Sequence, residues 1–144
     1  MPEAPAPAQT LLAFDFGIRR IGVAIGNTVT WAARPLATLE KESNEARFAA
    51  IANWIDEWQP DRLVVGKPLN PEGRVTEMTA RAERFGRQLA GRFGLPVEFA
   101  DERYTSAIAE SALKPGRENK ITIDAAAAAL ILQAWLDEAH NAHT

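Results

Sequence analysis

The residues Leu11–Gly26 read LLAFDFGIRRIGVAIG, two apolar runs separated by a short polar break. The first run predicts a strand over Leu11–Phe16 that ends at Gly17, and the second predicts a strand over Arg20–Gly26. Because the break is too short for a crossover, the two strands are expected to form an antiparallel hairpin. Asp15 places one carboxylate in the first run. An ionised carboxylate in an apolar setting is costly unless it is paired, hydrogen-bonded or bound to a metal, so Asp15 is the first candidate functional residue.

Alternating strand and helix patterns follow the hairpin. A third strand would complete an antiparallel meander, and Pro35 favours an edge position for it. The expected elements are a strand at Arg34–Glu40, a helix at Ser43–Trp58 capped by Ser43 or Asn44, a strand at Arg62–Gly66, a helix at Val75–Phe93, a strand at Val97–Ala100, a short helix at Thr105–Leu113 and a helix at Ile123–Ala139. Strands joined through helices form right-handed parallel crossovers. The sequence therefore predicts an α/β fold with one five-stranded mixed sheet and helices on both faces.

Length and composition limit the kinds of site available. The 144 residues suit a single domain, expected over residues 11–139, with a disordered lead-in at residues 1–10 and a frayed tail at residues 140–144. The chain has no cysteine, and its two histidines, His140 and His143, lie in that tail. A catalytic metal would therefore be held by carboxylates, which favour hard ions such as Mg²⁺ or Mn²⁺.

Net charge and hydropathy limit the nucleic-acid and membrane partners that the chain could bind. A net charge of −3 argues against a strong nonspecific nucleic-acid binder, although a local basic strip is compatible with it. No apolar run approaches the roughly 20 residues needed to span a bilayer, and the Pro- and Ala-rich start lacks the pattern of a signal peptide. We expect a cytoplasmic protein with no membrane partner.

Four acidic residues are candidates for one site. Asp15 lies near the end of the first strand, Asp101 and Glu102 follow the last strand, and Asp124 falls in the first turn of the final helix. Ligands of open α/β sheets gather at the carboxyl ends of the parallel strands, and the first and last strands can be neighbours at the sheet centre. Converging carboxylates raise one another's pKa values. One or two divalent ions remove that conflict, and a pair about 3.5–4 Å apart is typical of phosphodiester hydrolysis.

Each acid also has a plainer interpretation. Asp15 before Gly17 suits a turn, Asp101 and Glu102 suit a solvated surface near Arg103, and Asp124 suits a helix start, where negative charge is favourable. The basic residues at the same expected edge form a candidate nucleic-acid contact surface, or else serve only solubility and ion pairs: Arg19, Arg20, Lys67, Arg74, Arg103, Lys114, Arg117 and Lys120.

Four stretches resemble, in order, the motifs of the YqgF family, whose members are also called RuvX or Holliday junction resolvases. They are FDFGIRRIGVAIG, RLVVGKPLNPEG, DERYTS and KITIDAAAAALIL, and the likeness extends from Leu11 to Leu136. The resemblance implies an RNase H-like fold and metal-dependent nuclease activity, associated with maturation of the 5′ end of 16S ribosomal RNA. Lys67 departs from the pattern, because the family usually has leucine there.

By motif position, the resemblance assigns Asp15, Glu102 and Asp124 as catalytic metal ligands, with Asp101 as a substitute for Glu102. It implies two Mg²⁺ or Mn²⁺ ions and a nucleic-acid partner, either precursor rRNA, with a pre-ribosomal particle, or branched DNA. We expect a monomer or a weak homodimer. Two other classes compete: an actin-like or sugar-kinase-like phosphotransferase, which would need a second lobe, and a non-catalytic nucleic-acid-binding assembly factor.

Overall fold

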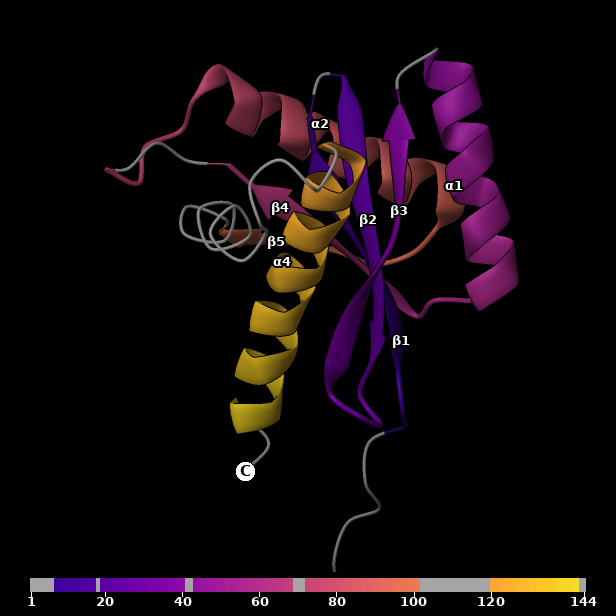
Figure 1. Ribbon diagram of the computed structural model, residues 1–144, viewed down its shortest axis with the longest axis vertical. Helices are drawn as coiled ribbons and strands as arrows, with labels where there is room; N and C mark the ends of the chain where they lie inside the picture. The colour runs from indigo at the N-terminus through magenta and orange to yellow at the C-terminus, as the bar shows by residue number, and fades with distance from the viewer. Residues whose placement is uncertain (1–6, 18, 41–42, 69–71, 102–119, 143–144) are drawn as a thin grey trace, which may run out of the picture.

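The computed structural model describes residues 7–17, 19–40, 43–68, 72–101 and 120–142. In these ranges the chain forms β1 (Thr10–Phe16), β2 (Arg20–Asn27), β3 (Ala32–Glu40), α1 (Asn44–Trp58), β4 (Arg62–Lys67), α2 (Glu77–Phe93), β5 (Val97–Asp101) and α4 (Lys120–Ala142) (Figure 1). These elements confirm the predicted order. The short helix predicted at Thr105–Leu113 lies outside the described residues.

The five strands form one mixed sheet in the order β3-β2-β1-β4-β5. β1 and β3 pair antiparallel with β2, whereas β4 pairs parallel with both β1 and β5. β3, which contains Pro35, is an edge strand as predicted, because proline cannot donate a ladder hydrogen bond. The expectation that β1 and β5 are neighbours was wrong. The hairpin already occupies one side of β1, so the first crossover strand, β4, takes the other side and leaves β5 at the edge.

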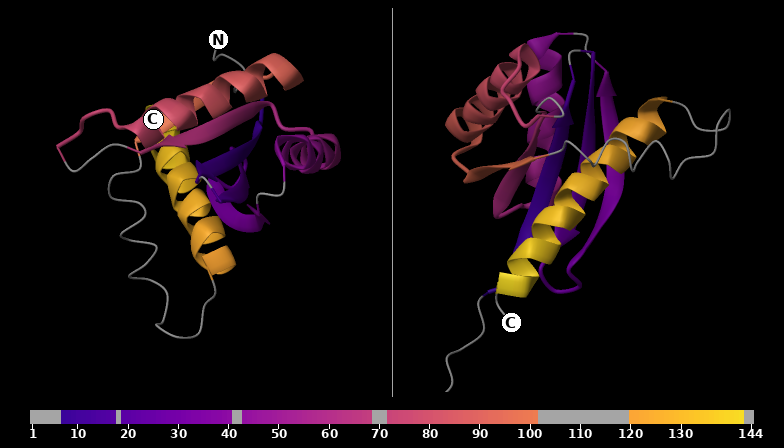
Figure 2. Two further views of the ribbon diagram at one scale, coloured as in Figure 1. Left: turned by 90° about the horizontal axis from the view of Figure 1, so that it is seen from above. Right: turned by 90° about the vertical axis from the view of Figure 1, so that its left-hand side faces the viewer.

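Helices cover both faces of the sheet (Figure 2). Leu12 and Phe14 of β1 belong to the core cluster that includes Phe48 of α1 and Phe85 of α2. The alternate β1 residues, with Leu11 and Ala13 among them, pack instead against α4. This two-residue alternation is the normal side-chain geometry of a strand, and it identifies the α4 side as the face onto which Asp15 also projects.

The helix ends follow from local capping. The hydroxyl of Ser43 accepts a hydrogen bond from the Ala46 N–H at 3.0 Å and caps α1, which decides between the two predicted caps. Thr76 and Thr79 form a reciprocal capping box at the start of α2, so α2 begins two residues later than predicted.

α4 is longer than predicted at both ends. It starts at Lys120 and continues to Ala142, so the frayed tail expected from residue 140 onward was wrong for residues 140–142. The ring of His140 stacks on Trp31 at a centroid distance of 4.3 Å, and this contact extends the packing of α4 beyond Leu136. None of the described helices combines the length and apolar character required to cross a membrane.

Candidate active site

Several candidate residues meet at one edge of the sheet, which we call the carboxyl edge. β1, β4 and β5 end there at Phe16, Lys67 and Asp101, and β2 begins there at Arg20. Parallel strands end on the same side because they run in the same direction. The topology therefore gathers residues from four strands at the position expected for a ligand site in an open α/β sheet.

Asp15 lies at the carboxyl edge and on the face covered by α4. It is partly buried, and its partner in the antiparallel register is Gly22 of β2. Directly opposed residues in such a pair project onto the same face of the sheet. The side chain of Asp15 therefore stands beside the backbone of Gly22, with no Gly22 side chain between it and α4.

At Gly22 the backbone of α4 lies directly against the backbone of β2. A Cβ atom at this position would lie 1.9 Å from the carbonyl oxygen of Asp124 and 2.3 Å from its carbonyl carbon. Only a residue without a side chain permits so close an approach of two backbones. Because Gly22 pairs with Asp15, the contact brings two acids that are distant in the sequence to neighbouring positions on one face of the sheet.

Asp124 is held by an arginine from the start of β2. The Nε of Arg20 donates to Oδ2 of Asp124 at 3.0 Å, and the two side chains are 29% and 27% exposed. Sequence analysis had placed Arg20 among the nucleic-acid contacts, but in the structure its partner is one of the candidate metal ligands. A partly exposed pair of this kind contributes about 1 kcal/mol or less to folding. Its main effect is to orient the Asp124 carboxylate.

The position of Asp124 in α4 excludes its plainer interpretation. Since α4 begins at Lys120, Asp124 is in the second turn, and the first turn contains no acidic residue. The prediction of a first-turn position was therefore wrong, because the helix starts three residues earlier than its apolar pattern indicated. The helix-dipole effect falls off within the first turn, so the dipole does not account for this carboxylate.

The fourth strand separates Asp101 from Asp15. Asp101 is exposed at the end of β5, and two strand spacings amount to about 10 Å. Within the described ranges, no three His, Asp or Glu side chains come together to hold one metal ion. Glu102, the third member of the predicted set, lies outside the described residues. The structure thus places the backbone of Asp124 against Gly22, next to Asp15, and leaves Asp101 two strands away from Asp15.

The basic candidates fall into three groups. Arg19 and Arg74 are exposed near the carboxyl edge. Lys67 forms an ion pair with Glu83 of α2, with 3.5 Å between Nζ and Oε2, as the plainer interpretation of these residues anticipated. Arg103, Lys114 and Arg117 lie outside the described residues, and Lys120 is the first residue of α4.

One charged residue near this edge was missed by sequence analysis. Arg47, in the first turn of α1, is only 6% exposed, and its guanidinium carbon lies 5.8 Å from the ring centroid of Phe16. Burial lowers the pKa of the Arg47 guanidinium, because desolvation penalises its charged form. A signal was present in the sequence, since Arg47 stands four residues before Ile51 on the apolar side of α1.

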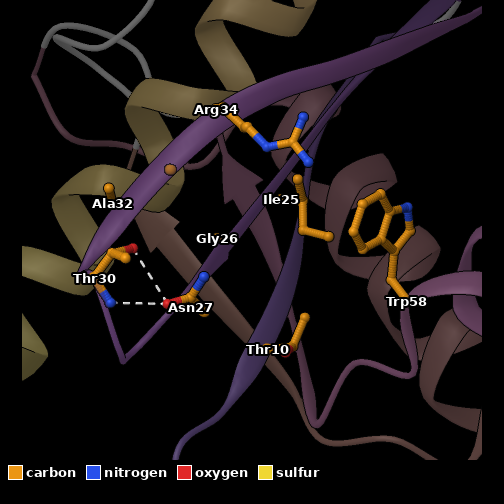
Figure 3. Close-up of a pocket in the computed structure, with 9 residues that line it drawn as sticks. Thr10, Ile25, Gly26, Asn27, Thr30, Ala32, Arg34 and Trp58 are labelled. Carbon is orange, nitrogen blue, oxygen red and sulfur yellow. Dashed lines mark hydrogen bonds between the residues drawn. The ribbon is translucent and has the colours of Figure 1, made fainter.

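A separate hollow of about 260 Å³ lies at the opposite end of the sheet (Figure 3). Its lining includes Arg34 and Trp58, with the guanidinium carbon 5.5 Å from the ring centroid. Asn27 accepts hydrogen bonds there from the N–H and the hydroxyl of Thr30. Its lining contains none of the acidic candidates, so it is distinct from the carboxyl edge.

The chain is similar to known proteins over most of its length. A family model described as "RuvX: Holliday junction resolvase" matches residues 9–138. A protein of Paraburkholderia phymatum named "Putative pre-16S rRNA nuclease" is 53% identical over 128 residues, which cover 89% of this chain and 85% of that protein. A protein of the same name from Dechloromonas aromatica is 54% identical over 136 residues, covering 92% and 93%.

Solved structures with the same fold include two junction resolvases. Thermus thermophilus RuvC, in complex with a Holliday junction substrate, matches with a TM-score of 0.58 at 16% identity, covering 92% of this chain and 96% of that one. The fowlpox virus resolvase, in complex with Holliday junction DNA, matches with a TM-score of 0.59 at 11% identity, covering 90% and 98%. These likenesses confirm the predicted RNase H-like fold.

Proposed function

This chain belongs to the RuvX family, and from that premise we propose that it is a metal-dependent nuclease that matures the 5′ end of precursor 16S rRNA in the cytoplasm. The observation that carries the proposal is the meeting of Asp15 and Asp124 over Gly22. Neighbouring carboxylates at one edge of the sheet form part of the donor set that a two-metal phosphodiesterase site needs for its cations. The names of the curated relatives support the choice of rRNA.

The residues present fit hard divalent ions. Asp15 and Asp124 offer only oxygen donors, which Mg²⁺ and Mn²⁺ prefer, and the guanidinium of Arg20 already supplies positive charge to one of them. We assign Asp15, Glu102 and Asp124 as the residues that hold two such ions, with Asp101 as the substitute for Glu102. The ions would supply an activated water and stabilise the leaving oxygen of the phosphodiester.

The other residues of the edge hold the substrate or the acids. Arg20 keeps the Asp124 carboxylate turned toward the start of β2. Arg19, Lys67 and Arg74 stand at the same edge and would contact substrate phosphates, since Lys and Arg contacts supply most of the affinity for a nucleic-acid backbone. We assign the same role to Arg103, Arg117 and Lys120.

A direct comparison of substrates tests this function. Purified protein with Mg²⁺ or Mn²⁺ is offered a 5′-extended 16S rRNA precursor and, separately, a four-way DNA junction, and the products are mapped by primer extension and gel electrophoresis. We expect shortening of the rRNA at its 5′ side and an uncut junction.

The family description favours a second candidate, a junction resolvase. Symmetric cuts in two strands need two sites, so this candidate requires a homodimer. Junction cleavage by a species that sediments as a dimer would establish it in place of the rRNA nuclease. Binding of either substrate without cleavage would instead indicate an assembly factor.

Arg20 and Arg19 are expected to differ in kinetic effect although they are neighbours with the same charge. Replacing Arg20 by Ala releases the Asp124 carboxylate, so we expect kcat for rRNA cleavage to fall about tenfold, or about 1.4 kcal/mol. The melting temperature should change little, because a partly exposed ion pair contributes about 1 kcal/mol or less. Replacing the exposed Arg19 by Ala should mainly raise KM. Equal effects of the two variants on kcat would contradict an orienting role for Arg20.

A further inference from the structure

The helix α2 differs in charge from the other described helices. It carries four arginines and two glutamates, whereas acidic residues outnumber Lys and Arg in both α1 and α4. Both glutamates have cationic partners: Glu77 pairs with Arg81 at 2.9 Å, and Glu83 pairs with Lys67 at 3.5 Å. In a chain with a net charge of −3, α2 is therefore a local concentration of positive charge.

All four arginines are exposed, and three of them follow one another at three-residue intervals along α2. The buried side of α2, including Phe85 and Leu89, packs on the sheet, while Arg81, Arg84 and Arg87 are exposed. Residues three apart are neighbours on a helix surface, with a rise of about 4.5 Å along the axis. We call these three residues the α2 arginine face. Arg84 and Arg87 form no ion pair with any of the described residues.

The start of α2 is fixed at the carboxyl edge. The hydroxyl of Thr79 donates to the carbonyl oxygen of Pro68, directly after β4, and Thr79 also shares the capping box with Thr76. α2 covers the face of the sheet opposite α4 (Figure 2). A polynucleotide that contacts both the acids and the α2 arginine face must therefore pass over the carboxyl edge.

We propose that the α2 arginine face binds the phosphate backbone of a long RNA whose cleaved bond lies at the carboxyl edge. The inference rests on the proposed function for the identity of the ligand. The exposed guanidinium groups suit phosphate, because their planar donors match its oxygens. An acidic protein partner is the alternative that the test has to separate, because Phe99, one of the large exposed apolar residues of the described chain, packs against Gly86 of α2 and protein interfaces depend on apolar or aromatic anchors.

The test measures RNA affinity against salt in full-length protein carrying Asp15→Asn, which prevents cleavage during the measurement. Into this background Arg84→Ala and Arg87→Ala are introduced together. For an RNA of about 60 nucleotides we expect Kd to rise about tenfold, and the slope of log K against log salt to fall by about 1.4, since each single-strand phosphate contact contributes about 0.7.

Two control variants separate charge from position. Arg84→Lys with Arg87→Lys keeps the charge and should retain most of the affinity. Arg34→Ala removes one charge at the opposite end of the sheet, beside Trp58, and should leave the long-RNA slope unchanged. An unchanged slope in the double alanine variant overturns the proposal. The proposal is also overturned if the double alanine variant loses affinity for an acidic protein and keeps its affinity for RNA.

The outcome is separable from that of the proposed function. Cleavage of rRNA by the parent protein, together with an unchanged long-RNA slope, would leave the nuclease assignment standing and remove the α2 arginine face. A reduced slope in a protein that cleaves no nucleic acid would support RNA binding by the α2 arginine face and remove the nuclease assignment.

Discussion

Replacing Asp15 by Asn should reduce cleavage by on the order of 10³-fold, about 4 kcal/mol of transition-state stabilisation, while the protein remains folded. The two side chains have nearly the same shape, so the packing between β1 and α4 is preserved. What is lost is a negative charge beside Gly22, at the position where Asp124 approaches. The melting temperature should therefore change little.

The measurement is the initial cleavage rate in Mg²⁺ or Mn²⁺, with thermal unfolding recorded on the same samples. Asp61→Asn is a matched control, because Asp61 lies at the other end of β1 and accepts a hydrogen bond from the Thr10 N–H at 2.8 Å. It should cleave at the parent rate. If Asp15→Asn also cleaves at the parent rate, the activity belongs to a different site or to a contaminant.

Gly22→Ala should damage both the fold and the site. The added Cβ would lie 1.9 Å from the carbonyl oxygen of Asp124, and this atom belongs to backbone, so it cannot be relieved by rotating a side chain. α4 has to move away from β2, which takes Asp124 away from Asp15. Overpacking of this kind costs about 1–3 kcal/mol, and we expect the upper end of that range in urea unfolding. Cleavage should fall about as far as in Asp15→Asn.

A second glycine provides the control for this prediction. Gly91 lies in α2 with no atom within 4 Å of where its Cβ would be, and alanine is favoured over glycine inside a helix by about 0.5–1 kcal/mol. Gly91→Ala should therefore stabilise the protein and leave cleavage unchanged. If Gly22→Ala proves as stable as the parent, α4 does not pack on β2 at Asp124, and the inference that Asp124 lies next to Asp15 is wrong.

Much of the fold could be predicted because it depends on local patterns. The two-residue alternation around Asp15 and the short break at Gly17 predict a hairpin, and helix-separated strands predict parallel crossovers. The place of β5 could not be predicted in the same way. It depends on which sides of β1 and β4 are already occupied, and this is a property of the assembled sheet. The expected contact between β1 and β5 failed for that reason.

For the candidate site, too, the sequence predicts the features that depend on local patterns and not those that depend on the assembled fold. Asp15 and Asp124 could be identified as candidates from the sequence, because each is a carboxylate within an apolar run. The partners of the charged residues could not, since no spacing relates Arg20 to Asp124 or Lys67 to Glu83. The true start of α4 was also missed, because Lys120 and the residues after it do not show the apolar pattern of the rest of the helix.

The seating of α4 on β2 has a consequence for how the enzyme matures on the ribosome. Asp15 leaves the exit tunnel early in translation, but its partner acid arrives only with α4, the last of the described elements. Contacts between segments so far apart form late in folding. A half-made chain therefore lacks one of the two acids that we assign to the metal site, so on the proposed function it gains nuclease activity only after α4 has been synthesised.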